Sequence, residues 1–192
     1  DLTILYDTSE IFTIDLSIKK KLDQKVNFND ISSSIILEAN QLIKSCYINK
    51  KIINKIIKKY IINNEEFLNI PDNLSEFNSL ILELKFICLP QNQYDNVFEV
   101  FKKNNLNILN FFSSSLVKSF QYIDFFKKNK FVTFLDIGLD RTTIIFFINQ
   151  KLDSMNSIPI GGSNISKDIS QIMQLSLEES EELKKTFNKS EI

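Results

Sequence analysis

The sequence predicts an α/β protein. Short runs rich in Ile, Leu, Val and Phe alternate with segments in which apolar residues recur every three or four positions, so strands and helices follow one another along the chain. Two almost wholly apolar runs, Phe131 to Ile137 and Thr143 to Ile148, are typical of central sheet strands buried on both faces. With 43% apolar residues over 192 positions, the chain can bury a sizeable core.

The first segments predict two strands and a helix. Leu2 to Tyr6 and Ile11 to Ser17 are strands separated by a polar turn. From Phe28 to Ile43 the apolar residues take helical spacing, with Asn29 or Asp30 available to cap the start.

The next segments predict two more strands. Lys51 to Asn63 fits a helix as well as a strand, but its β-branched residues and the polar turn behind it favour the strand. After a loop around Pro71 to Asn73, apolar residues alternate from Leu80 to Cys88, which predicts a strand with one strongly apolar face. A boundary near Pro90 separates an α+β unit from an α/β unit.

Strands and helices alternate beyond Pro90. A helix over Tyr94 to Phe101 is followed by a strand over Asn107 to Phe112 and a helix over Leu116 to Ile123. The order strand, helix, strand, helix, strand predicts parallel pairing with covering helices.

The C-terminal third predicts a hairpin, a third strand and two helices. Gly138 to Thr142 is short enough to join the two apolar runs as a hairpin, and Ser154 to Ile160 is the third strand. Two helices follow Gly161-Gly162, and Ser176 with Glu179 has the pattern of a capping box at the start of the second.

Composition excludes several classes of function. The chain has no histidine, which rules out Ser-His-Asp and Cys-His catalysis, and its two cysteines lack the spacing of a zinc site. A formal charge of -1 gives no overall argument for nucleic acid or an anionic membrane. Neither a run of about 18 apolar residues nor a signal-peptide pattern is present, which favours a cytoplasmic protein. The start at Asp1 without a methionine suggests a fragment of a longer protein.

One constellation predicts phosphate chemistry. A strand ending in Asp136, followed by a tight turn at Gly138, presents backbone N–H groups to a phosphate, while the carboxylate can hold hydrated Mg²⁺. A Gly-Gly pair before a helix lets the backbone approach a ligand closely. Taken alone, the Asp136 strand end is more often structural than phosphate-binding, and the Gly-Gly pair is as often only a strand-to-helix turn.

The same residues resemble the actin/Hsp70-type ATPases, and most closely the FtsA family of bacterial cell-division proteins. That family reads DIGGGTTDI, then iPxGG, then AExxK, where residues 131–185 of this chain contain DIGLDRTTI, IPIGG and SEELK. The resemblance implies actin-like (ribonuclease H-like) subdomain portions with an inserted small α+β subdomain of the FtsA-specific, SHS2 type.

The resemblance also implies a division of the chain into four parts. Residues 1–14 end the first actin-like segment, 15–90 are the inserted subdomain, 91–130 complete the first actin-like subdomain, and 131–192 begin the second.

The site residues follow from the same resemblance. Ser166 and Asp168 match the T and D at the start of the first helix after the Gly-Gly pair, and Asp136 would hold Mg²⁺ through water. No catalytic residue is indicated. The residues implied to bind ATP are Asp136, Gly138, Thr142, Gly161, Gly162, Glu181 and Lys184.

This chain departs from the family at the phosphate loop. Leu139, Asp140 and Arg141 replace two glycines and a threonine, and Thr143 replaces an aspartate. The loop is bulkier and carries a new carboxylate, so we expect weak ATP binding or none, and at most a weak ATPase.

The implied function is that of a division scaffold. Members of the FtsA family bind ATP, polymerise and link FtsZ filaments to the cytoplasmic membrane at the septum, with other divisome proteins as partners. Their FtsZ-docking subdomain and amphipathic membrane helix would lie beyond Ile192. The alternatives are a PilM-like pilus-assembly protein and an Hsp70- or sugar-kinase-like phosphotransferase, which lacks an insert at this place.

Overall fold

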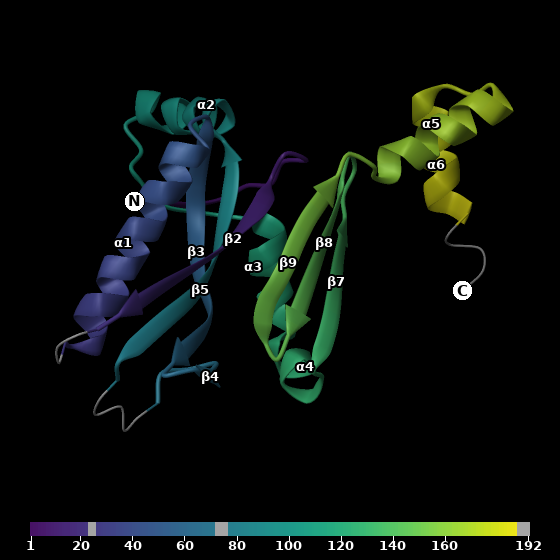
Figure 1. The fold of residues 1–192 in the computed structure, drawn as a ribbon. Coiled ribbons are helices and arrows are strands. Elements are labelled where there is room, and N and C mark those ends of the chain that lie inside the picture. Colours follow the sequence, from purple (N-terminus) through teal and green to yellow (C-terminus); the bar gives the residue numbers. More distant parts are fainter. Residues whose placement is uncertain (23–25, 72–76, 188–192) are drawn as a thin grey trace.

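The computed structural model describes residues 1–22, 26–71 and 77–187. Within these ranges the strands form three sheets joined by short helices (Figure 1). The two-stranded sheet is parallel, and the other two are antiparallel. The sheets are β1 (Leu2–Leu5) with β6 (Ile108–Phe112); β2 (Phe12–Lys21), β5 (Ser79–Pro90), β3 (Lys50–Ile62) and β4 (Glu65–Phe67); and β7 (Phe131–Ile137), β8 (Thr142–Ile148) and β9 (Lys151–Ile158).

Helix α1 (Phe28–Cys46) covers one face of the four-stranded sheet. Its buried Ile35, Ala39 and Ile43 pack in one apolar core with Leu82 and Leu84 of β5. The helix and the strand predicted from the sequence therefore pack on each other. We call α1 with β2, β3, β4 and β5 the four-stranded unit.

The start of α1 corrects one expectation. The cap is Asn27, whose side chain accepts a hydrogen bond from the Asn29 backbone N–H at 2.8 Å. Capping by Asn29 or Asp30 was therefore wrong, because the helical backbone already includes both residues.

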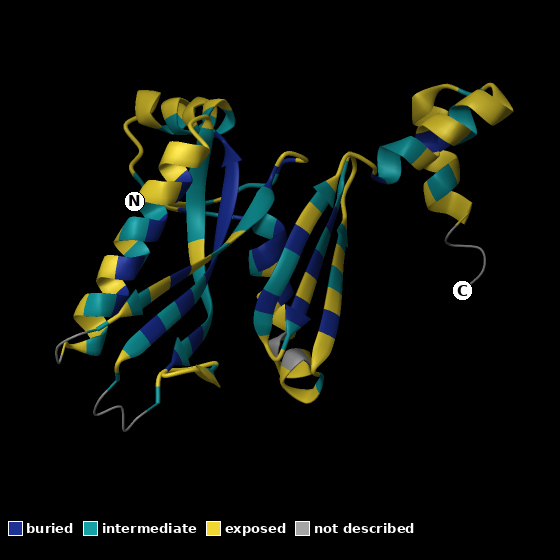
Figure 2. Ribbon diagram, viewed as in Figure 1, coloured by how far each residue is buried: buried dark blue, intermediate teal, exposed yellow. Residues whose placement is uncertain are grey.

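The opposite face of the four-stranded sheet packs on the three-stranded sheet. Ile87 of β5 and Ile11 share a second apolar core with Val132, Ile145 and Phe147. The long strand β5 thus contributes residues to both cores, and its second half is dark blue in Figure 2 because every residue there is buried.

The predicted parallel order of the later strands is wrong. Strands β5, β6 and β7 lie in three different sheets, and among the described strands only β1 and β6 pair in parallel. The physical reason is that α2 (Gln91–Lys103) and the helical segment from Ser114 lead the chain to a new sheet each time, and alternation predicts parallel strands only within one sheet.

Strand β7 is an edge strand rather than a central one. Within the described residues only β8 pairs with it, and Phe131 and Ile137 are 68% and 67% exposed, whereas Val132 is buried. The alternating colours of β7 in Figure 2 show that one face of the strand is exposed to solvent and the other is packed. Burial on both faces was wrong for β7 because an apolar composition does not say whether a covering layer is present.

The remaining differences are local. The single helix expected over Leu116 to Ile123 is α3 (Ser114–Ser119), a 3₁₀ turn and α4 (Ile123–Lys128). Only Asn63 and Asn64 of the predicted polar turn after β3 form the turn, with positive φ angles of 49° and 72°. The next residue, Glu65, already belongs to β4. The loop expected around Pro71 to Asn73 falls largely outside the described residues.

Two helices follow the three-stranded sheet. α5 (Gly162–Met173) and α6 (Leu177–Phe187) pack on each other and extend away from the sheets (Figure 1). The capping box is confirmed, because Glu179 accepts from the Ser176 backbone N–H at 2.9 Å. None of the helices in the described ranges has the length and apolar character needed to cross a membrane.

Candidate functional site

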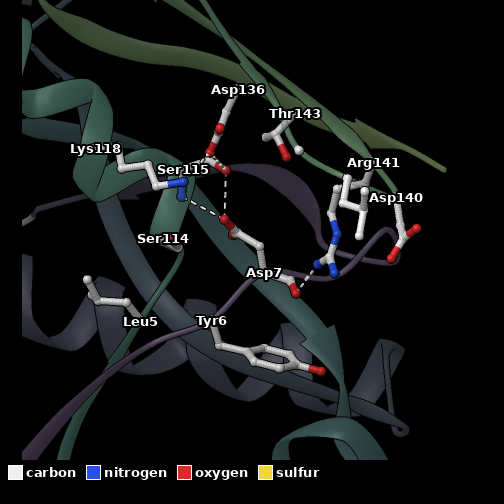
Figure 3. A pocket seen from close by; sticks show the side chains of 12 residues that line it. Leu5, Tyr6, Asp7, Ser114, Ser115, Lys118, Asp136, Asp140, Arg141 and Thr143 are labelled. Atoms are coloured by element: carbon white, nitrogen blue, oxygen red, sulfur yellow. Dashed lines mark hydrogen bonds and ion pairs between the residues drawn. The ribbon is translucent and has the colours of Figure 1, made fainter. Parts of the chain in front are cut away.

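A cleft of about 420 Å³ lies where the ends of several elements meet (Figure 3). Because β1 and β6 are parallel, their carboxyl ends lie at the same edge and bring Asp7 next to the start of α3. The end of β7 and the hairpin behind it form the other wall. The lining residues are Leu5, Tyr6, Asp7, Ser114, Ser115, Lys118, Asp136, Gly138, Leu139, Asp140, Arg141 and Thr143.

Asp7 holds the start of α3. Its Oδ1 accepts from the Ser113 hydroxyl at 2.7 Å, and its Oδ2 accepts from the backbone N–H and the hydroxyl of Ser115, both at 2.6 Å. Ser113 is the N-cap, with its Oγ accepting from the Leu116 N–H. A carboxylate is favourable at a helix N-terminus, so Asp7 ties the end of β1 to α3.

Asp136 is held from the same helix. Its Oδ2 accepts from the Ser115 hydroxyl at 2.8 Å and from Lys118 Nζ at 2.9 Å. Partial burial by itself would raise the pKa of Asp136, but the hydrogen bonds from Lys118 and Ser115 and the Lys118 charge lower it below its ordinary value.

The donor set around the two carboxylates does not form a ready magnesium site. The Ser115 hydroxyl carries one proton and lies between Asp7 and Asp136, so it can donate to only one of them at a time. Lys118 supplies the positive charge beside Asp136 that a divalent ion would otherwise bring.

The bulky residues of the hairpin turn are bonded to the chain itself. The Gly138 N–H donates to the Arg141 carbonyl at 2.8 Å and closes the turn. The Arg141 guanidinium donates to the carbonyl of Asp7, and Asp140 Oδ1 accepts from the Ser163 hydroxyl at 3.0 Å. The only arginine of the chain is therefore directed at the backbone beside the cleft.

The start of α5 is packed against this turn. The N–H groups of Gly162 and Ser163 donate to the carbonyls of Gly138 and Leu139 at 2.9 and 2.7 Å. A Cβ on Gly161 would lie 2.5 Å from the Leu139 carbonyl oxygen, so only glycine fits this close approach. The sequence pattern predicted that these amides would face a ligand, but they donate to the carbonyls of the hairpin turn instead.

A second polar cluster joins α5 to α6. Lys184 Nζ donates to the Gly162 carbonyl and the Ser166 hydroxyl, both at 2.9 Å, and to Glu181 Oε2 at 2.6 Å. The Ser166 hydroxyl donates to the same Glu181 oxygen at 2.5 Å. The hydrogen bond from Lys184, followed by that from Ser166, lowers the pKa of Glu181.

The structure places the predicted residues in two groups. Asp136 and Gly138 line the cleft, whereas Glu181 and Lys184 bind each other behind the Gly161-Gly162 pair. Two residues fall outside both groups: the Thr142 hydroxyl donates to the Ile160 carbonyl at 2.7 Å, and Asp168 is exposed on α5.

Sequence reasoning missed Asp7, Ser115 and Lys118. The signal was available in part, because Asp7 and the Ser113-Ser114-Ser115 run each follow a short apolar strand. Recognising that these two strands pair in parallel, although about a hundred positions apart, would have placed both at one sheet edge.

The fold defines the class of protein: an α/β protein in which the four-stranded unit is inserted in the sequence between the two paired parallel strands β1 and β6. Within that class the chain is similar to FtsA. A family model described as "Cell division protein FtsA" matches residues 133–191. The Cell division protein FtsA of Bacillus subtilis (strain 168) is 29% identical over 150 residues, which cover 78% of this chain and 34% of that protein. The resemblance seen in the sequence is confirmed, and the chain spans about a third of this relative.

One solved structure shares the fold. A chain of the PilM-PilN type IV pilus biogenesis complex superposes with a TM-score of 0.58 at 14% identity, over 93% of this chain and 48% of that one. A Bacteroides thetaiotaomicron protein with an actin-like ATPase fold and unknown function gives a TM-score of 0.35 at 15% identity, over 90% of this chain and 52% of that one, which is too low to indicate a shared fold. At such identities the likeness concerns the fold alone.

Proposed function

We propose that this chain is part of an actin-like scaffold of the bacterial division machinery. The scaffold self-assembles, contacts FtsZ and other divisome proteins, and works at the cytoplasmic membrane of the septum. The observation that carries this proposal is the FtsA likeness, which includes the residues of the hairpin turn and of α5 and α6.

The proposal also assigns a role to each part of the chain. Residues 15–90 are the inserted subdomain that contacts partners, and residues 1–14, 91–130 and 131–192 are portions of two actin-like subdomains. The separate core of the four-stranded unit supports this division, since a unit with its own core can be presented to a partner as one body.

We infer that the scaffold uses nucleotide weakly or not at all. ATP with Mg²⁺ would have to displace Lys118 from Asp136 and fit beside Leu139 and Asp140. Arg141, which could offset the added negative charge, is bonded to the Asp7 carbonyl. The residues of the cleft therefore favour a role in assembly over a role in ATP hydrolysis.

A second candidate is a PilM-like role in pilus assembly. The specific observation in its favour is the TM-score of 0.58 over 93% of this chain with a chain of the PilM-PilN complex. The FtsA proposal stands first because the sequence likeness, at 29% identity, is with FtsA, whereas the PilM-PilN likeness has 14% identity.

Depletion in the source organism separates the two. The whole reading frame that encodes this chain is placed under a repressible promoter. In a second strain, a fluorescent fusion of the whole protein is imaged together with labelled FtsZ. Filamentous cells and a mid-cell band that coincides with FtsZ are expected. Normal division together with loss of surface pili would reject the division role in favour of the pilus role.

A further inference from the structure

A groove of about 740 Å³ lies between α1 and β3, on the four-stranded unit and outside the cleft described above. One wall is a flank of α1, and the other is the first half of β3. The residues that line it are Leu37, Asn40, Gln41, Lys44, Ile48, Lys50, Lys51, Ile52, Lys55 and Gln91.

The groove carries charge of one sign. Four of its lining residues are lysines, and no carboxylate is among them. Lys44 and Lys55 are exposed and form no ion pair with a residue in the described ranges. Glu38 of α1 is paired with Lys20 of β2 and does not line the groove. The four ammonium groups therefore attract an acidic partner.

The backbone of β3 is open on one edge. From position 50 to 59 the strand pairs with β5, while β4 pairs with it only at Tyr60, Ile61 and Ile62. In the part of the chain that the structure describes, no strand uses the other edge of this half. Such an edge accepts an added strand through its N–H and C=O groups.

Apolar side chains complete the groove. Leu37 on α1 and Ile48 just after it are 60% and 81% exposed, and Ile52 on β3 is half-buried beside them. Two large aliphatic side chains left this exposed can bury apolar surface of a bound segment.

We propose that this groove binds an extended acidic segment of a partner protein. The segment adds a strand to the free edge of β3, places its carboxylates near Lys44 and Lys55, and packs alternate apolar side chains on Leu37 and Ile48. A helix beside an open strand edge is a known arrangement for peptide recognition by strand addition.

Other anionic partners fit the groove less well. A membrane surface is flat, whereas these lysines line a hollow, and the lining has no aromatic side chain on which a nucleic-acid base can stack. This proposal deepens the partner contact proposed above for residues 15–90, where all the lining residues except Gln91 lie. It does not use the nucleotide cleft, and the depletion experiment tests the division role separately from the peptide titration.

The test is a binding titration with the whole chain. The probe is a fluorescein-labelled peptide of about ten residues that alternates glutamate with leucine, long enough to cover the free half of β3. Binding measured by fluorescence anisotropy is expected to saturate and to weaken as salt is added. The Lys44→Glu/Lys55→Glu double variant should lose at least about tenfold in affinity, since two attractive contacts become repulsive.

A matched variant controls for net charge. Lys103→Glu/Lys128→Glu makes the same charge change at exposed positions outside the groove and should leave the affinity unchanged. Circular dichroism checks that both double variants are folded. Equal loss of affinity in the two double variants would overturn the proposal, as would the absence of saturable binding to the parent.

Modified probes test the mode of binding. A peptide N-methylated on alternate residues cannot donate those backbone hydrogen bonds and should bind at least about tenfold more weakly. Undiminished binding of that peptide would overturn strand addition. Phosphatidylglycerol vesicles and poly(U) RNA are tested as alternative partners. If either bound more tightly than the peptide and lost affinity in the Lys44→Glu/Lys55→Glu variant, the proposed peptide partner would be wrong.

Discussion

Lys118 and Asp136 form an ion pair inside the cleft, with Lys118 Nζ 2.9 Å from Asp136 Oδ2. The lysine is on α3 and the aspartate is the penultimate residue of β7, so the pair joins the helix that follows the parallel sheet to the three-stranded sheet. The ammonium group of Lys118 therefore lies beside Asp136, the carboxylate for which the sequence pattern predicted a bound Mg²⁺.

Replacing Lys118 should cost little stability. The Lys118 side chain is 52% exposed, and ion pairs at the surface contribute about 0 to 1 kcal/mol, so Lys118→Met should lower the free energy of unfolding by no more than that. Urea denaturation measures the change. Lys127→Met, which removes the exposed pair with Asp124, is the control. A loss of several kcal/mol for Lys118→Met alone would mean that the pair holds the sheets together.

Acid should weaken the contact between α3 and β7. The pKa of Asp136 is lowered from 3.8 in the folded chain, so its stabilising contribution is present above the unfolded value and is lost as pH falls through the lower folded value. The unfolding free energy measured between about pH 5 and pH 2 should fall less steeply in Asp136→Asn. Glu181 has a lowered pKa as well, so Glu181→Gln is compared beside it. An unchanged slope in Asp136→Asn would refute the assignment.

Gly161 should not tolerate a side chain. A Cβ there would lie 2.5 Å from the Leu139 carbonyl oxygen and 2.6 Å from the Arg141 nitrogen, both backbone atoms. Gly161→Ala should therefore destabilise by about 1 to 3 kcal/mol, as overpacking does. Gly162→Ala is a close control, because its Cβ would meet only the flexible Lys184 Nζ at 3.5 Å and the Gly138 carbonyl at 3.7 Å, and should change stability by less than about 1 kcal/mol. Thermal unfolding that ranked the two variants in the opposite order would contradict the packing.

The buried Lys85 should depend on Asp15. Lys85 is fully buried, and its Nζ lies 2.7 Å from Asp15 Oδ1. Asp15→Asn leaves a buried cation with a weaker partner and should cost about 1 to 3 kcal/mol. Lys85→Met removes the buried charge and should cost less, because Asp15 is 59% exposed and keeps Lys58 Nζ at 3.8 Å, while an apolar side chain suits the buried position. Urea unfolding compares the two variants. A larger loss in Lys85→Met would show that the lysine itself stabilises the sheet.

The sequence was sufficient for elements with strong local patterns. The helix from Phe28 and the strand from Leu80 were predicted because each has one apolar face of regular period. The sheet order was not, because the pairing of Leu2–Leu5 with Ile108–Phe112 is set by packing across about a hundred residues. For the same reason Asp136 and Gly138 could be selected from their motif, whereas Asp7 and Lys118 emerged only with the tertiary structure.

The most direct test of the account is an ATP titration. Protein from the whole reading frame is titrated with fluorescent ATP and Mg²⁺, beside the variants Asp140→Gly and Lys118→Ala. We expect binding in the millimolar range or weaker for the parent and tighter binding in the variants, since each change removes an obstacle to the phosphates. Micromolar binding by the parent, with no gain in either variant, would contradict the proposal that ATP binds weakly or not at all.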